Sequence, residues 1–426
     1  MRKKAFLKAY LFLIVLLFCL LIPDTIVFAD EPVVVVIDPG HGGENLGAEY
    51  DGYTEKKMTM VVARAMKEEL EKYDGVVVYL THETDVDMSL KERAEFAKEK
   101  HADFLYSLHF NASVKHNLFG SEVWIPAYGD YYVKGYQFAE IQMQEFENIG
   151  LYSRGIKTKL NDKGTDYYGI LRQCTELEVP SALIEHCHMD QDNDKPFYQQ
   201  GEEQWKEFGR MDAEAVAKYF GLKSGEKDTD YSNYPKASVV WQEGAVEPDK
   251  TPPEISEIEL LHVDKTSAKL KVHIKASDSN SYIQYYKYSF DGGITYSDLQ
   301  KWPRPVWNES EPETTCEISA IYDREIDLRI CVYNGFDGWT ESNCITIEPI
   351  SSPKAEESVK EEKKEYREIT YTPVNDTDAE TIYNKGALAG VIISIVLISI
   401  VILALLFAVI KMLLMLKPHS KTRKKQ

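Results

Sequence analysis

The chain has 426 residues, which is enough for two or three domains. Its 49 basic and 69 acidic residues give a net charge of −20, which argues against a nucleic-acid-binding protein, because such a protein needs a basic face. The chain is 44% hydrophobic and 28% charged, a composition typical of folded globular protein, so disorder over the whole length is excluded.

Residues 1–29 have the pattern of a secretory signal peptide. A basic tip precedes an apolar run from Ala9 to Ile22, and Pro23 and a cleavage site at Val27-Phe28-Ala29 follow the run. We predict cleavage after Ala29. The alternative is an uncleaved anchor, although the apolar run is shorter than the roughly twenty residues of a membrane span.

Residues 33–222 alternate between strand-like and helix-like patterns. Apolar runs predict strands, and apolar residues at helical spacing predict helices. Strands are expected at 33–38, 75–80, 103–109, 120–125 and 180–185, and helices at 58–70, from 89 onward, at 136–146 and at 204–220. Ser89 and Glu92 form a capping box that opens the second helix. This alternation predicts an α/β domain with a mixed, largely parallel sheet and helices on both faces.

The second half of the exported chain has a different composition. Residues 223–250 are polar and broken by prolines, so we interpret them as a linker. Residues 251–349 contain short alternating segments separated by turn signals, which predicts an all-β, immunoglobulin-like sandwich. Its aromatic residues stand at alternating positions, which indicates that they pack in the core and across strands. A carbohydrate-binding platform is the less favoured interpretation. We expect the module to be a spacer or to bind a protein or cell-wall partner.

Residues 350–385 mix acidic and basic residues with few apolar ones and predict a charged stalk. Residues 386–410 have no charged side chain and are long enough, at about 1.5 Å per residue, to cross a bilayer as one helix. A basic tail, residues 411–426, follows, and the positive-inside rule places it in the cytoplasm. We therefore expect a single-pass membrane protein with residues 30–385 outside the cytoplasm.

Four residues of the first domain have side chains suited to metal or acid–base chemistry. His41, His109 and Glu185 lie at the ends of predicted strands, and Glu55 immediately precedes the first predicted helix. Because ligands bind beyond the carboxyl ends of parallel strands, we expect these residues at one edge of the sheet. Each also has an ordinary interpretation, since a histidine at a strand end is often exposed and a glutamate before a helix often complements its dipole.

Two imidazoles and one carboxylate form a catalytic zinc set that leaves a position open for water. A nearby carboxylate outside the set can then accept the proton of that water. The sequence therefore predicts His41, Glu55 and His109 as Zn²⁺ ligands and Glu185 as the catalytic base. Asp38, which precedes the turn to His41, is interpreted as a cap of that turn without a chemical role.

A series of motifs within residues 33–222 resembles one family, the zinc-dependent N-acetylmuramoyl-L-alanine amidases of bacteria. The motifs, in chain order, are Asp38–Gly43, Thr54–Lys56, Leu80–Asp85, Ser89–Arg93, Ala102–Phe104, Ser107–Ala112, Gly120–Trp124, Leu171–Gln173 and Val179–Glu185. The resemblance implies hydrolysis of the amide between N-acetylmuramic acid and L-alanine of peptidoglycan. It also implies His41, Glu55 and His109 as zinc ligands and Glu185 as the catalytic glutamate.

The chain departs from the family pattern after Glu185, where it has His186, Cys187 and His188, followed by Met189 and Asp190, in place of the usual Gly-Phe and Ser-Asn pair. One of these three residues would contact the metal or substrate, or all three would pack and support the strand; we expect the latter. Arg172 is predicted to meet a substrate carboxylate or to form an ordinary salt bridge. His101 and His116 are expected to be surface residues without a partner.

Two other functions remain open from the sequence. The same metal chemistry would suit a zinc peptidase that cuts the stem peptide of peptidoglycan. A wall-binding regulator without catalytic activity is the other alternative, and the presence of all four site residues argues against it.

Overall fold

The computed structural model describes residues 31–353. The predicted signal peptide, most of the charged stalk, the predicted membrane helix and the basic tail lie outside the described residues. Among residues 31–353, no helix is both long enough and apolar enough to cross a membrane. These residues all belong to one unit of the chain.

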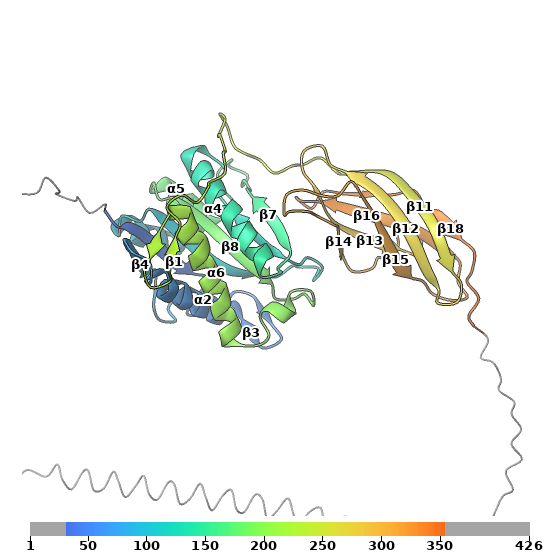
Figure 1. The fold of residues 1–426 in the computed structure, drawn as a ribbon, viewed down its shortest axis with the longest axis horizontal. Helices are drawn as coiled ribbons and strands as arrows, with labels where there is room; N and C mark the ends of the chain where they lie inside the picture. Colours follow the sequence, from blue (N-terminus) through green and yellow to red (C-terminus); the bar gives the residue numbers. More distant parts are fainter. Residues whose placement is uncertain (1–30, 354–426) are drawn as a thin grey trace, which may run out of the picture. The chain divides into compact units, whose positions relative to one another are not determined.

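A six-stranded sheet forms the centre of the α/β domain (Figure 1). Its strands run in the order β4–β1–β5–β8–β6–β7. Their bounds are β1 (Val33–Pro39), β4 (Val76–Leu80), β5 (Phe104–Asn111), β6 (Ser121–Trp124), β7 (Ser153–Lys157) and β8 (Ser181–His188). Neighbouring strands are parallel except β6 and β8, which are antiparallel. The prediction of a mixed, largely parallel sheet is confirmed.

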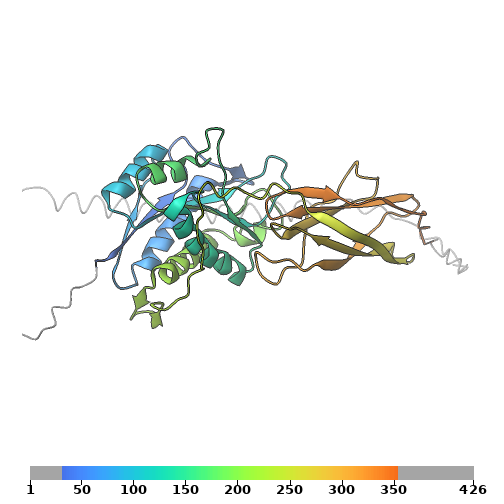
Figure 2. The same ribbon diagram turned by 90° about the horizontal axis from the view of Figure 1, so that it is seen from above.

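Helices cover both faces of this sheet (Figure 2). On one face lie α2 (Glu55–Leu70), α4 (Gly129–Asn148) and α6 (Glu202–Phe220); on the other lie α3 (Leu90–Glu99) and α5 (Gly169–Glu176). The alternation of side chains along a strand divides the two cores. Val35 and Ile37 of β1 belong to the first core, and Val36 belongs to the second. All three are fully buried.

The helix and strand ends show where sequence patterns were informative. The capping box at Ser89 is present, and its hydroxyl accepts a hydrogen bond from the Glu92 amide. Helix α4 begins at Gly129 rather than at the predicted residue 136, and β8 continues past Glu185 to His188. The patterns do not predict β7 or α5, because the first carries two charged side chains and the second has only eight residues.

Residues 251–349 form two antiparallel sheets, which we call the sandwich domain. One sheet has the order β11–β12–β15, and the other has the order β14–β13–β16–β17, with β18 paired to β16. The strands are β11 (Glu254–Asp264), β12 (Lys269–Ser277), β13 (Ile283–Ser289), β14 (Gln300–Lys301), β15 (Glu313–Ser319), β16 (Ile326–Asn334), β17 (Trp339–Glu341) and β18 (Ile345–Ile347). Leu270, Trp302 and Leu328 lie in a core that both sheets share. The immunoglobulin-like classification stays a prediction.

The segment predicted as a linker, residues 223–250, is attached to the α/β domain. It starts with a small hairpin of β9 (Lys223–Ser224) and β10 (Thr229–Asp230). The Asp74 amide donates a hydrogen bond to the Lys223 carbonyl at 2.7 Å, and the Val246 amide donates to the Ala127 carbonyl at 2.9 Å. These contacts hold both ends of the segment against the surface of the domain.

Candidate metal centre

The structure brings three of the predicted site residues together at one edge of the sheet. His41 lies in the turn after β1, His109 lies near the end of β5, and Glu55 is the first residue of α2. One ligand atom from each residue lies within 4.8 Å of the other two. The two carboxylate oxygens of Glu55 lie 2.9 Å from His109 Nδ1 and 3.0 Å from His41 Nε2.

Backbone amides hold the Glu55 carboxylate in this position. The Ala48 amide donates to Oε2 at 2.7 Å, and the Phe110 amide donates to Oε1 at 3.0 Å. Burial acts to raise the pKa of Glu55, but hydrogen bonds and charge from the two histidines outweigh it and lower this pKa. Glu55 is therefore an ionised, preoriented carboxylate, as a metal ligand must be.

Each imidazole uses its second nitrogen for a supporting contact. His41 Nδ1 lies 3.0 Å from Asn45 Oδ1, and His109 Nε2 lies 3.2 Å from Ser107 Oγ. Ser107 Oγ in turn donates to Asp38 Oδ2 at 2.9 Å. Such contacts fix the ring orientation of metal-binding histidines and are typical of metal centres.

Asp38 is part of this support, so its interpretation as a mere turn cap is wrong. Its side chain is buried and accepts hydrogen bonds from Thr81 Oγ1 and Arg93 Nη1, both at 2.7 Å, in addition to Ser107. The partners lie in α3, in β5 and directly after β4, so Asp38 fixes the end of β1 and, through Ser107, the ring of His109. In the sequence, Asp38 is marked by its position next to the His41 turn and by its place at the start of the Asp38–Gly43 motif.

Two glycines let the backbone approach the ligands closely. A Cβ at Gly47 would lie 2.5 Å from Glu55 Oε2 and 2.6 Å from His41 Cδ2, and the φ of Gly47 is +71°. A Cβ at Gly40 would lie 2.6 Å from His109 Cε1. Side chains larger than glycine at these two positions would collide with the donor groups. The donor set itself, two imidazoles and one carboxylate, fits zinc.

Glu185 lies beside the metal-ligand set without joining it. In the sheet it is paired with His109 of β5 on one side and with Glu122 of β6 on the other. Its side chain is buried, and Oε2 has no hydrogen-bond partner among the described residues. Burial, with the carboxylates of Glu55 and Glu122 nearby, raises the pKa of Glu185 well above that of an ordinary glutamate. A carboxylate with a raised pKa is suited to accept a proton.

The three residues after Glu185 are engaged elsewhere. His186 is fully buried, with Nδ1 2.9 Å from the His109 carbonyl oxygen and Nε2 2.8 Å from Asp212 Oδ2. His188 Nδ1 lies 2.9 Å from the Gly120 carbonyl oxygen, and burial lowers the pKa of His188 to about 4. Cys187 is buried in the main core. These positions agree with the expected packing and supporting roles.

Two other predictions about single residues differ in part from the structure. Arg172 donates to the carbonyl oxygens of Asp166 and Tyr167 and forms no ion pair among residues 31–353, so the salt-bridge alternative is wrong, whereas contact with a substrate carboxylate stays a prediction. His116 has a side chain 64% exposed, as expected, but it does have a partner, because its Nδ1 lies 2.7 Å from Asp190 Oδ2. His101 is exposed.

Residues 35–218 match the family described as "N-acetylmuramoyl-L-alanine amidase". The amidase LytC of Bacillus subtilis is 34% identical over 165 residues, which cover 36% of this chain and 30% of LytC. The protein YqiI of the same organism, which is uncharacterized, is 30% identical over 162 residues, 37% of this chain and 72% of YqiI.

Among solved structures, Cwp6 from Clostridium difficile has 31% sequence identity and a TM-score of 0.41, with 43% of this chain and 29% of that chain covered. The chain spans less than two thirds of the length of several curated amidases that it matches, for example 23% of AmiC of Escherichia coli.

Proposed function

Because the chain belongs to the N-acetylmuramoyl-L-alanine amidase family through residues 35–218, we propose that this domain hydrolyses the amide between N-acetylmuramic acid and L-alanine of peptidoglycan. One observation carries the proposal. His41, Glu55 and His109 place three metal-ligand atoms within 4.8 Å of one another, next to a buried carboxylate, Glu185, that has a free oxygen. We further propose that the metal is zinc and that these three residues are its ligands.

The residues of the site have different roles in the hydrolysis. Bound zinc would supply Lewis acidity toward a water molecule and the scissile carbonyl. Glu185 accepts a proton from the attacking water and passes it to the nitrogen of the departing L-alanine. Asn45, Ser107 and Asp38 keep the ligand side chains oriented, so the site needs little rearrangement during the reaction.

Purified peptidoglycan tests this function directly. The full chain should release intact stem peptides with new L-alanine amino termini, and a chelator should abolish the release until Zn²⁺ is added back. Mass spectrometry of the digest identifies the bond that is cut. Loss of only terminal amino acids from the stem would instead indicate a zinc peptidase, and a wall-binding protein without any release would be a regulator.

We also propose that the chain is anchored in a bacterial cell membrane by residues 386–410, with the catalytic domain outside the cytoplasm. The uncharged run and the basic tail after it support this orientation. A protease added to intact cells should degrade the region of residues 30–385 and spare an epitope on the tail, residues 411–426. Degradation of that epitope in intact cells would reverse the orientation.

A further inference from the structure

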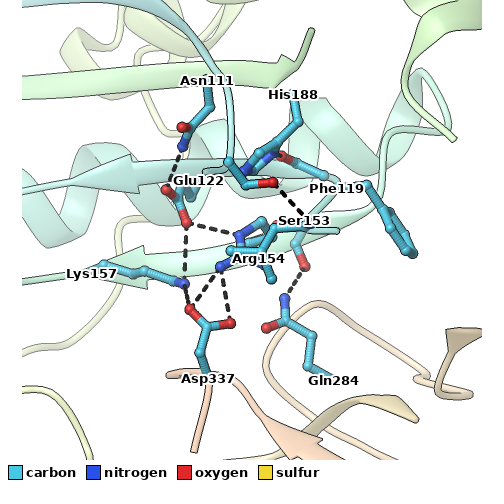
Figure 3. A network of polar contacts seen from close by, with 12 residues as sticks. Asn111, Phe119, Glu122, Ser153, Arg154, Lys157, His188, Gln284 and Asp337 are labelled. Atoms are coloured by element: carbon cyan, nitrogen blue, oxygen red, sulfur yellow. Dashed lines mark hydrogen bonds and ion pairs between the residues drawn. The ribbon is translucent and has the colours of Figure 1, made fainter. Parts of the chain in front are cut away.

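A cluster of charges surrounds the buried Glu122 of β6 (Figure 3), and Glu122 is paired across the sheet with Glu185 of the candidate active site. Glu122 Oε1 accepts hydrogen bonds from Asn111 Nδ2 at 2.9 Å and Trp124 Nε1 at 3.1 Å. Glu122 Oε2 lies 3.0 Å from Arg154 Nε and 3.1 Å from Lys157 Nζ, both of β7. Burial acts to raise the pKa of Glu122, but the two cations outweigh it and lower this pKa.

The sandwich domain supplies the fourth charge of this cluster. Asp337, in the turn between β16 and β17, accepts two hydrogen bonds from Arg154 Nη2, at 2.9 and 3.0 Å. Lys157 Nζ lies 3.7 Å from Asp337 Oδ2. The side chains of Arg154 and Lys157 are only 2% and 4% exposed. Two buried cations are therefore balanced by two carboxylates, of which one comes from the other domain.

Neighbouring contacts show that the sandwich domain is fitted to β7. Arg304 Nη2 and Gln284 Nε2 donate to the Ser153 carbonyl oxygen at 2.8 and 3.3 Å. A Cβ at Gly155 would lie 2.2 Å from the hydroxyl oxygen of Tyr282, so this close approach requires glycine. The edge strand of the catalytic sheet is thus shaped to receive the sandwich domain.

We propose that Asp337 of the sandwich domain is a positioning residue of the amidase centre, which holds Arg154 and Lys157 away from Glu185. This proposal rests on the proposed function. Without Asp337, two buried cations would face one carboxylate, and leaving a buried charge unbalanced is costly.

Glu185 is the carboxylate that lies beside this cluster, across the sheet from Glu122. It is paired with Glu122 across β6 and β8, and directly opposite residues in a sheet lie within reach of each other's side chains. Its Oε2 has no hydrogen-bond partner among the described residues. A cation drawn to this oxygen would occupy the position at which Glu185 accepts the proton. By holding the two cations, Asp337 of the sandwich domain keeps Glu185 available as the base, which is a role beyond that of a spacer.

Asp337→Asn in the full chain tests the role of the charge with little change in shape. We expect kcat on soluble muropeptides to be about tenfold lower in this variant than in the wild type. A change of this size in the activation barrier corresponds to the loss of one charge contact. KM and zinc content should stay unchanged, because neither the substrate nor the metal ligands are touched. Asp337→Glu should recover most of kcat. Wild-type kcat in Asp337→Asn would overturn the proposal.

A second substitution tests whether charge balance is the cause. Lys157→Met combined with Asp337→Asn leaves one cation and one carboxylate, so kcat and the thermal unfolding midpoint should both exceed those of Asp337→Asn alone. Arg304→Gln is the matched control, because it removes a hydrogen bond at the same junction but none of the four charges. It should keep kcat within about twofold of wild type, because the charges around Glu122 stay balanced in this variant.

The outcomes separate the two proposals. A loss of kcat in Arg304→Gln as large as that in Asp337→Asn would overturn the positioning role. It would mean that kcat depends on any contact between the two domains and not on the charge of Asp337. Additive effects of Lys157→Met and Asp337→Asn on the unfolding midpoint would also overturn it. A wild-type chain that releases no stem peptide would overturn the proposed amidase function, whereas the unfolding measurements do not depend on activity.

Discussion

His41→Ala and His109→Ala are each expected to lose the bound metal and, with it, all hydrolysis above background. Each substitution removes one of three protein ligands, and the remaining two hold zinc poorly. Loss of a supporting residue alone typically costs about 10–100-fold in metal affinity, so loss of a ligand should cost more. Metal analysis of the purified variants, together with release of stem peptides from peptidoglycan, measures both effects.

His116→Ala is the matched control for these two variants. His116 is also a histidine paired with a carboxylate, Asp190, but its side chain is largely exposed and belongs to no metal set. This variant should keep its zinc and its activity. Full zinc occupancy in both His41→Ala and His109→Ala would remove them from the coordination of the metal.

The sequence was sufficient to predict the edge of the sheet at which the site lies. Strands β1, β5 and β8 are buried on both faces, and their continuous apolar runs are visible in the sequence. Once these strands are parallel, the ends of β1 and β5 must come together, and His41 and His109 come with them. The juxtaposition of the two histidines therefore follows from local patterns and strand direction.

The support of the site could not be predicted in the same way. Asp38 contacts Thr81, Arg93 and Ser107, which lie 43 to 69 residues away along the chain. Local patterns contain no information on such pairs, because the pairs exist only after the strands have been arranged. A buried aspartate and a turn-capping aspartate look the same in the sequence.

Strand β7 is not predictable from its sequence for a related physical reason. Arg154 and Lys157 make its sequence look exposed, yet both side chains are buried. Burial of two cations is tolerated only because Glu122 and Asp337 balance them, and Asp337 lies in another domain.

The surface that the second domain covers also cannot be predicted from the sequence. Hydrophobic periodicity separates core positions from surface positions, but it does not tell which surface a second domain covers. Trp302 packs inside the sandwich domain, whereas the hydroxyl group of Tyr285 donates to the Phe119 carbonyl of the α/β domain.

Glu185→Gln is expected to keep its zinc and to lose turnover by about 10²–10⁴-fold, the usual contribution of general acid–base catalysis. A base accepts the proton of the attacking water without binding the metal, and Glu185 lies outside the set formed by His41, Glu55 and His109. Glutamine preserves the shape of the side chain but cannot accept this proton. The wild-type rate should also fall toward acid as Glu185 takes up a proton, and this limb of the pH profile should be absent in the variant.

The neighbours of Glu185 decide how this result is interpreted. His186 and His188 direct their ring nitrogens to the His109 carbonyl, Asp212 and the Gly120 carbonyl, so neither is placed to replace the lost base. Residual turnover in Glu185→Gln should therefore stay low at every pH. Zinc loss from a variant with an unchanged unfolding midpoint would instead make Glu185 a fourth ligand. Near-normal turnover would overturn the role of Glu185 as the base.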